Sequence, residues 1–149
     1  MSLIIRPFSP QDRESWFSLW QQYLVFYKHE LSTEQTQLTW NRLLSNEGPI
    51  FGFLAELDGA VVGFTHHSFT HSTWEANPAM YVEDLFVDPS VRQHGAARAL
   101  AENLFEVATA QNAPRVHWIT QSHNTTARAF YDQVGDLTEF VLYERQLTQ

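Results

Sequence analysis

Two adjacent carboxylates, Glu83 and Asp84, lie inside an apolar run that extends from Met80 to Val87. The run predicts a strand, and carboxylates are rare in strands and costly to bury without a partner. Because side chains alternate along a strand, we expect the two acids to point to opposite faces. A carboxylate held in this way is suited to accept a proton as a general base. A salt bridge or a solvated sheet face is the plain alternative.

The same run leads into a segment suited to bind an anion. Residues 92–97 read Arg-Gln-His-Gly-Ala-Ala and precede a helical pattern. Small residues at a helix start let the backbone approach a ligand, and the first N–H groups of the helix have no partner within it. Arg92 can add a charged contact to a phosphate oxygen. The alternative is that Gly95 and the alanines only allow close packing of the helix on the sheet.

A third candidate group is the phenol of Tyr131. It follows Phe130 on the inner side of an expected helix whose first residue is preceded by Asn124, a good N-cap. A phenol can act as an acid or as a hydrogen-bond donor. A core tyrosine on an amphipathic helix is the alternative.

Three histidines, His66, His67 and His71, could in principle bind zinc. Adjacent histidines on a strand point to opposite faces, and no carboxylate stands at helical ligand spacing from them. We therefore expect no metal site.

Alternating strands and helices must position these groups. Aromatic and leucine residues recur at helical spacing from Trp16 to Tyr27, and Ser32 with Gln35 predicts a capping box for a second helix. Asp58-Gly59 predicts a hairpin turn. The further expected helices are Ala97–Ala108 and Asn124–Val134, and the expected strands are Leu3–Arg6, Ile50–Leu57, Ala60–Phe69, Met80–Val87, Arg115–Thr120 and Leu137–Leu147.

The resulting order is β-α-α-β-β-β-α-β-α-β, which predicts an α/β fold. Its mixed sheet of six or seven strands should be mostly antiparallel, with helices on both faces. The length of 149 residues suits one domain, residues 1–149.

The amino-acid composition limits the classes of molecule that the protein can be expected to bind. The net charge of -8 disfavours nucleic acid, whose phosphates require a basic surface, and suits a cationic ligand. The sequence has no cysteine, which excludes disulfides and thiolate chemistry, and no apolar run approaches the roughly 18 residues that span a bilayer. We expect a cytoplasmic protein that does not associate with membranes.

Together, two motifs resemble those of the GCN5-related N-acetyltransferase (GNAT) superfamily. Residues 92–97 resemble its Arg-Gly-x-Gly-x-Gly/Ala motif, although Gln93 stands where glycine is commonest and limits the local backbone. The later motif, Asn-x-x-Ala-x-x-Phe-Tyr-x-x-x-Gly, is matched by residues 124–135. Residues 81–87, Tyr-Val-Glu-Asp-Leu-Phe-Val, resemble the diamine (spermidine/spermine-like) and yeast histone and polyamine acetyltransferases.

This resemblance implies an enzyme that moves an acetyl group from acetyl-CoA to a primary amine. By the resemblance, Glu83 is the base, directly or through a water, and Tyr131 is the general acid that protonates the leaving thiolate. It also implies that the cofactor is held by Leu85, Phe86, Val87, Arg92, Gln93, His94, Gly95, Ala96, Ala97, Arg98, Asn124, Ala127 and Tyr131.

The substrate is expected to be a polyamine or another small cationic amine, because aromatic and acidic side chains together suit a cation. Its candidate contacts are Phe26, Tyr27, Glu83 and Asp84. A protein lysine or an N-terminal amine is the alternative acceptor, and a non-catalytic acyl-CoA-binding module is the alternative class. Relatives are commonly homodimers and the last expected strand is apolar on both faces, so we expect a homodimer.

Overall fold

The computed structural model describes residues 2–91 and 94–148. The chain divides into two compact units, residues 1–118 and 119–149, and each is described by itself. The prediction of one domain over the whole chain stays a prediction.

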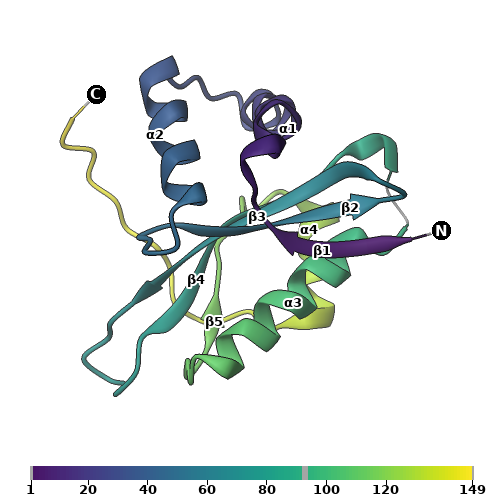
Figure 1. The fold of residues 1–149 in the computed structure, drawn as a ribbon. Helices are drawn as coiled ribbons and strands as arrows, with labels where there is room; N and C mark the ends of the chain where they lie inside the picture. The colour runs from purple at the N-terminus through teal and green to yellow at the C-terminus, as the bar shows by residue number, and fades with distance from the viewer. Residues whose placement is uncertain (1, 92–93, 149) are drawn as a thin grey trace. The chain divides into compact units, whose positions relative to one another are not determined.

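The first unit is built on a five-stranded sheet (Figure 1). Its strands are β1 (Leu3–Pro7), β2 (Phe51–Leu57), β3 (Ala60–Thr70), β4 (Ala79–Val87) and β5 (Val116–His117), in spatial order β1-β2-β3-β4-β5. The first four strands pair antiparallel, and β4 pairs with β5 in parallel. The predicted mixed, mostly antiparallel sheet is confirmed.

The predicted hairpin joins β2 to β3. Asp58 and Gly59 both have positive φ, 50° and 87°, which is the backbone of a type I′ turn. This turn matches the right-handed twist of the two strands, so it sets their antiparallel register.

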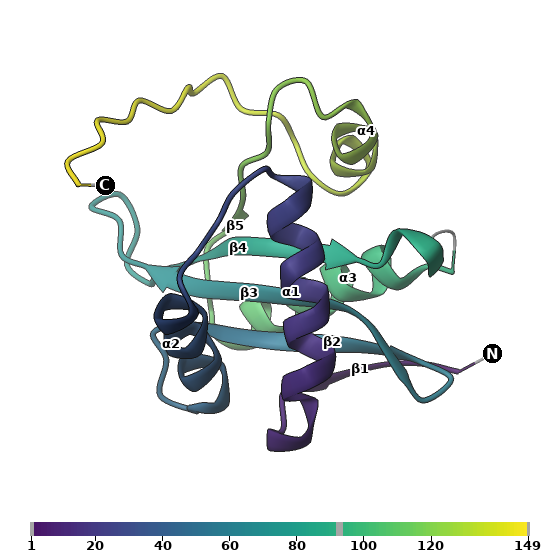
Figure 2. The same cartoon turned by 90° about the horizontal axis from the view of Figure 1, so that it is seen from above.

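One face of the sheet is covered by α1 (Arg13–Phe26) and α2 (Thr33–Leu44), as Figure 2 shows from above. Ser32 caps α2 by accepting a hydrogen bond from the backbone N–H of Gln35 at 3.1 Å, which confirms the predicted N-cap. The core between these helices and the sheet is rich in aromatic residues. Its buried members are Trp16, Leu19, Trp20, Leu24, Trp40, Leu43, Leu54 and Phe64.

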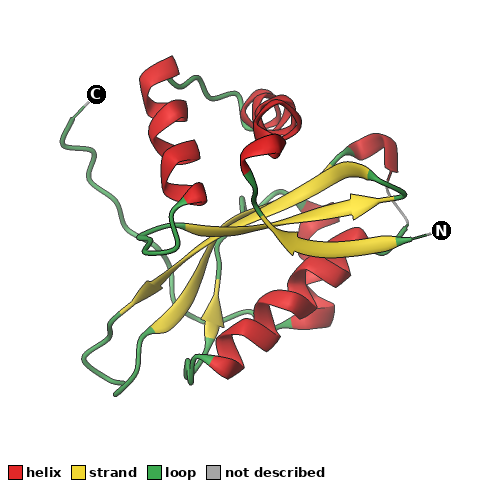
Figure 3. Ribbon diagram, in the orientation of Figure 1, coloured by secondary structure: helices red, strands yellow, loops and turns green. Residues whose placement is uncertain are grey.

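The other face is covered by α3 (Ala96–Ala110), so the prediction of helices on both faces is confirmed (Figure 3). Leu100 and Ala96 pack with residues of β2 and β3, while Leu104 and Ala108 pack with Met80 and Val82 of β4. The helical spacing of these side chains predicted this buried stripe.

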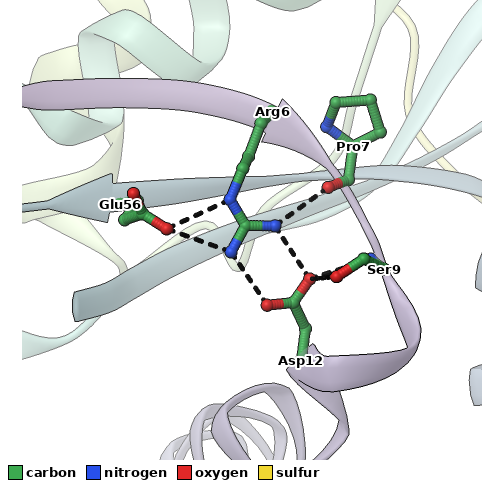
Figure 4. A network of polar contacts seen from close by, with 5 residues as sticks. All are labelled: Arg6, Pro7, Ser9, Asp12 and Glu56. Atoms are coloured by element: carbon green, nitrogen blue, oxygen red, sulfur yellow. Dashed lines mark hydrogen bonds and ion pairs between the residues drawn. The ribbon is translucent and has the colours of Figure 1, made fainter. Parts of the chain in front are cut away.

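An ion-pair network joins the end of β1 to the start of α1 (Figure 4). The guanidinium of Arg6 donates to both carboxylate oxygens of the buried Asp12 at 2.8 Å and to Glu56 on β2 at 3.1 Å. The backbone N–H and the hydroxyl of Ser9 donate to the same carboxylate. Because of these bonds, the pKa of Asp12 falls to about 2.

Two strand predictions need correction. The strand expected at residues 115–120 is only two residues long, β5. The strand expected at Leu137–Leu147 does not form among the described residues, which leaves five strands instead of six or seven. Alternating apolar residues make a strand only when a neighbouring strand accepts their backbone hydrogen bonds, and residues 119–148 contain no other strand.

The second unit contains one helix, α4 (Thr125–Val134), within its described residues 119–148. In the described parts of the chain, no helix is both long enough and apolar enough to cross a bilayer.

Candidate active site

The pairing of β3 with β4 is interrupted at the acidic pair. His66 lies opposite Asp84, and His67 lies opposite Val82. One step along β3 therefore corresponds to two steps along β4, and Glu83 is the extra residue of a β-bulge. A bulge leaves its extra residue outside the hydrogen-bonding ladder and re-aims the side chains that follow it.

The bulge breaks the alternation of side chains along β4 at the acidic pair. Val82 packs beneath α3, whereas Asp84, two residues further on, bonds to Tyr23 of α1 and lies on the α1 face. In an unbroken strand these two side chains would share a face. Glu83, the extra residue between them, is exposed. The expectation that the two carboxylates point to opposite faces stays a prediction.

Asp84 is held by two side chains. The hydroxyl of Tyr23 donates to one carboxylate oxygen at 2.5 Å, and the Nδ1 atom of His66 lies 2.8 Å from the other. On the far side of the imidazole, the indole Nε1–H of Trp16 donates to Nε2 of His66 at 3.0 Å. Both Trp16 and His66 are buried, while Asp84 is half-buried.

Among the described residues, no side chain holds Glu83 by a hydrogen bond, and Glu83 is exposed. Burial of its carboxyl on the sheet nevertheless raises its pKa above the ordinary value, and the neighbouring Asp84 charge raises the pKa further. His66 opposes this rise in the pKa of Glu83. The pKa of Tyr81 is also raised, first by burial and then by the two acids. Glu83 is thus the carboxyl of the pair that binds a proton more readily than usual.

The start of α3 has the features of an anion site. Gly95 precedes the helix with φ at +79°, and a Cβ built on it meets nothing within 4 Å. The N–H of Ala99 donates to the carbonyl of Gly95 at 3.0 Å in the first turn of the helix, and the backbone N–H groups at a helix start point away from the helix along its axis. An open, donor-rich helix start fits a pyrophosphate.

Other predicted anion contacts are placed only in part. Arg92 and Gln93 lie outside the described residues. His94 is described in the turn before α3, and Arg98 lies 3.7 Å from Glu102 one turn along the helix, where both side chains are exposed.

The end of β4 supplies the link between the bulge and α3. Leu85 and Val87 pack on the α3 side, whereas Phe86 packs with the aromatic core beneath α1. Among the described residues, β5 pairs with β4 only at Met80 and Tyr81. The two strands therefore separate before β4 reaches the bulge at Glu83.

In the second unit, Asn124 caps α4 as predicted, since its side chain accepts from the N–H of Ala127 at 3.2 Å. Tyr131 is half-buried, and its ring centroid lies 5.7 Å from that of Phe130. The structure brings Glu83 and Asp84 together in the first unit and Asn124, Ala127 and Tyr131 on one helix in the second.

Two of the predicted substrate contacts, Phe26 and Tyr27, lie at the end of α1. Phe26 is exposed and Tyr27 half-buried, and their ring centroids are 5.0 Å apart. Tyr27 also lies 4.8 Å from Tyr23, whose ring meets Phe86 of β4 at 5.6 Å. A row of rings therefore connects the end of α1 with the acidic bulge.

Three residues of this site escaped sequence reasoning in their present role: Trp16, Tyr23 and His66. Trp16 and Tyr23 follow the apolar stripe of α1, which predicts core packing, and the sequence offers Tyr23 otherwise only as a wall of the substrate site. The sequence offers His66 as a metal ligand or as part of a histidine-lined substrate or surface patch, and neither is a partner for Asp84. The one usable signal was that two acids on a strand needed a partner.

The histidines do not form a metal centre. Within residues 2–91 and 94–148, no group of three or more potential ligands gathers. His67 instead lies buried, stacked on Phe51 and Phe53 with centroid distances of 5.6 and 5.9 Å. Burial lowers its pKa to about 4.

Residues 13–135 match the acetyltransferase (GNAT) family. The D-amino-acid N-acetyltransferase HPA3 of Saccharomyces cerevisiae is 30% identical over 145 residues, covering 96% of this chain and 90% of the yeast protein. The thialysine N-epsilon-acetyltransferase of Caenorhabditis elegans is 28% identical over 126 residues, covering 85% of this chain and 78% of that protein.

A solved structure of the aminoglycoside acetyltransferase AAC(6')-Iy with a CoA-based bisubstrate analogue shares the fold, with a TM-score of 0.86 at 22% identity, covering 99% of this chain and 100% of that one. The chain belongs to the GNAT family of acetyltransferases. It is an N-acetyltransferase that uses acetyl-CoA as its co-substrate.

Proposed function

We propose that this enzyme acetylates a small cationic primary amine, such as a polyamine, with Glu83 as the base. The observation that carries the proposal is the bulge in β4, which leaves Glu83 outside the hydrogen-bonding ladder beside the carboxylate of Asp84 on the α1 face. Two carboxylates there give the site a negative charge, and the rings of Tyr23 and Tyr27 lie at its edge. Carboxylates and aromatic faces both attract an ammonium group.

A base is required because an alkyl amine with a pKa near ~10 is mostly protonated at neutral pH. Glu83, directly or through a water, accepts the proton as the amine nitrogen attacks the thioester carbon. The raised pKa of Glu83 suits this role, since a general base works best when its pKa lies near the operating pH. The new C–N bond forms while the C–S bond breaks, and Tyr131 returns a proton to the sulfur.

The co-substrate is proposed to lie along the end of β4 and the start of α3. The open backbone at Gly95 and the backbone N–H groups in the first turn of α3 bind the pyrophosphate. Backbone groups of Leu85 to Val87 bind the pantetheine beyond the point where β5 leaves β4. Asn124 and Ala127 on α4, and Arg92 with Gln93, are the remaining proposed contacts.

A panel of amines tests the substrate class. Purified protein with acetyl-CoA is assayed for CoA release with spermidine, thialysine, a D-amino acid, an aminoglycoside and a lysine peptide. The proposal expects the highest kcat/KM for a small amine with more than one positive charge. A preference for the D-amino acid or for the lysine peptide contradicts this choice of substrate but leaves the acetyltransferase assignment in place.

We also propose that the chain forms a homodimer through the apolar residues of its C-terminal segment. Phe140, Val141, Leu142 and Tyr143 are all at least 70% exposed in the described unit. A contiguous run of exposed apolar side chains favours burial against another surface. A monomeric mass in sedimentation velocity across the micromolar range refutes the dimer.

A further inference from the structure

We infer that Trp16 and His66 are positioning residues for acetyl transfer: Trp16 keeps His66 neutral, and His66 keeps Asp84 a carboxylate beside Glu83. The inference rests on the proposed role of Glu83 as base and extends it to residues that touch neither substrate nor co-substrate. It concerns a chain of four side chains, Trp16, His66, Asp84 and Tyr23, called here the Trp-His-Asp-Tyr chain.

The direction of each hydrogen bond follows from the donors. An indole N–H can only donate, so the 3.0 Å contact from Trp16 makes Nε2 of His66 an acceptor without a proton. The proton of the neutral imidazole is then on Nδ1, which donates to Asp84 at 2.8 Å. Tyr23 donates to the second carboxylate oxygen. The chain thus has one consistent set of proton positions.

Trp16 also opposes a second proton on His66. Protonated imidazole carries N–H groups on both nitrogens, which would set an N–H against the N–H of Trp16 in a buried contact. Both residues are almost fully buried, so water cannot relieve this clash. The aromatic rings of Phe64 and Trp20, 4.6 and 5.3 Å from His66, complete its apolar surroundings.

The two carboxylates of the bulge consequently have different surroundings. Asp84 receives a donor at each oxygen, and these bonds favour its ionised form. Glu83 follows a buried valine and is the residue next to that fixed negative charge. A like charge nearby makes it easier for Glu83 to bind a proton. Pairs of acids in different surroundings divide the roles of base and fixed charge.

Other titratable groups around Glu83 belong to each neighbouring strand and helix. Tyr81 precedes it on β4, His66 comes from β3 and Tyr23 from α1. His117 of β5 lies with its ring 5.0 Å from Tyr81, and burial lowers the pKa of this histidine, so it is neutral near pH 7. Within the first unit, Asp84 is therefore the fixed charge next to Glu83.

The test is the pH dependence of kcat/KM for acetyl transfer, whose acid limb reports protonation of the base. Two amines of different pKa are compared, because a limb that stays at the same pH for both belongs to the enzyme. Asp84→Asn removes the fixed charge and should move the acid limb roughly one pH unit lower. Trp16→Phe should move it in the same direction, since the freed His66 can take a proton and offset the charge of Asp84.

Rescue separates this role from a merely structural one. In His66→Asn the amide nitrogen takes the place of Nδ1 and still donates to Asp84, but it cannot be protonated, so the limb should stay where it is in the wild type. His66→Leu removes the donor and should move the limb lower. Trp20→Phe is the matched control for Trp16→Phe: Trp20 is also buried in α1, and among the described residues its indole N–H has no hydrogen-bond partner. It should leave the limb unmoved.

A measurement on the unaltered protein covers the case in which Trp16→Phe fails to fold. The 15N NMR signals of the His66 ring should show a proton on Nδ1 and none on Nε2 from about pH 5.5 to 8. An imidazolium pattern near pH 6 overturns the inference. It is also overturned if folded Asp84→Asn and Trp16→Phe both lose rate at every pH without a shift of the limb.

Glu83→Gln distinguishes the proposed role of Glu83 as the base from the proposed positioning role of the Trp-His-Asp-Tyr chain. If Glu83→Gln keeps both the rate and the acid limb, the proposed base is wrong. If it abolishes the limb while Asp84→Asn leaves the limb unmoved, only the role of the Trp-His-Asp-Tyr chain is wrong.

Discussion

Replacing His67 with phenylalanine should make the protein more resistant to acid. His67 is 2% exposed, and burial lowers its pKa from 6.5 to about 4. Unfolded chains bind a proton at this histidine below about pH 6.5, whereas the folded protein resists it until about pH 4. The neutral histidine therefore favours folding fully above pH 6.5, and this contribution is lost progressively as the pH falls to 4.

The magnitude follows from the difference between the two pKa values. The folded state loses about 2 kcal/mol at pH 5 and about 3 kcal/mol at pH 4 relative to pH 7.5 through this one group. His67→Phe removes the titration and keeps an aromatic ring against Phe51, Phe53 and Phe69, whose rings lie within 6 Å of the imidazole. It also removes the buried Nδ1 atom, for which the described residues provide no hydrogen-bond partner.

Urea unfolding of both proteins at several pH values between about 4 and 7.5 measures this effect. The difference in free energy of unfolding between variant and wild type should grow by about 2 kcal/mol from pH 7.5 to pH 5. The control is His71→Phe, at an exposed position of the loop after β3. A His67→Phe protein with the same pH dependence as the wild type refutes the assignment of a buried neutral histidine.

Three further predictions concern other parts of the fold. Asp12→Asn should lower the free energy of unfolding by about 2 kcal/mol near pH 7, because the lowered pKa of Asp12, about 2 instead of 3.8, stabilises the folded state above pH 3.8. In urea unfolding this loss should vanish as the pH falls through about 2. A loss that persists at that pH contradicts the pairing with Arg6. Ser32→Ala should lower the free energy of unfolding by about 1 kcal/mol because it removes the N-cap of α2, whereas Ser32→Asp should keep most of that stability. Equal free energies of unfolding for the wild type and both variants argue against the cap. Gly95→Val should raise the KM for acetyl-CoA at least roughly tenfold and leave the KM for the amine unchanged, because a side chain fills the open space beside the backbone at the start of α3. The control is Gly59→Val, at a turn residue that also has a positive φ, and it should change neither KM.

Local signals in the sequence predicted local structure well. The Asp58-Gly59 pair fixes the hairpin through two positive φ angles, and Ser32 caps α2 through a bond to a residue three positions away. The apolar spacing of α3 likewise predicted the face that Leu100 and Leu104 bury. Each of these features is decided within one or two turns of chain.

Features that depend on distant partners were missed. The bulge at Glu83 arises from the pairing of β4 with β3, and alternation within one strand gives no hint of it. Asp84 bonds to His66 and Tyr23, which are 18 and 61 residues away in sequence. At residues 137–147, the apolar alternation predicted a strand that does not form, because a sequence pattern alone cannot supply the neighbouring strand.

The role of Glu83 as the base is the central claim, and the pH profile of Glu83→Gln tests it most directly. The amide keeps the size of the side chain but cannot accept the amine proton. We expect kcat/KM for a small amine to fall roughly a hundred- to ten-thousand-fold, and the acid limb to disappear from the profile. Protection by acetyl-CoA in a melting assay should be unchanged, which shows that the co-substrate still binds. Wild-type kcat/KM with an intact acid limb in Glu83→Gln contradicts the account.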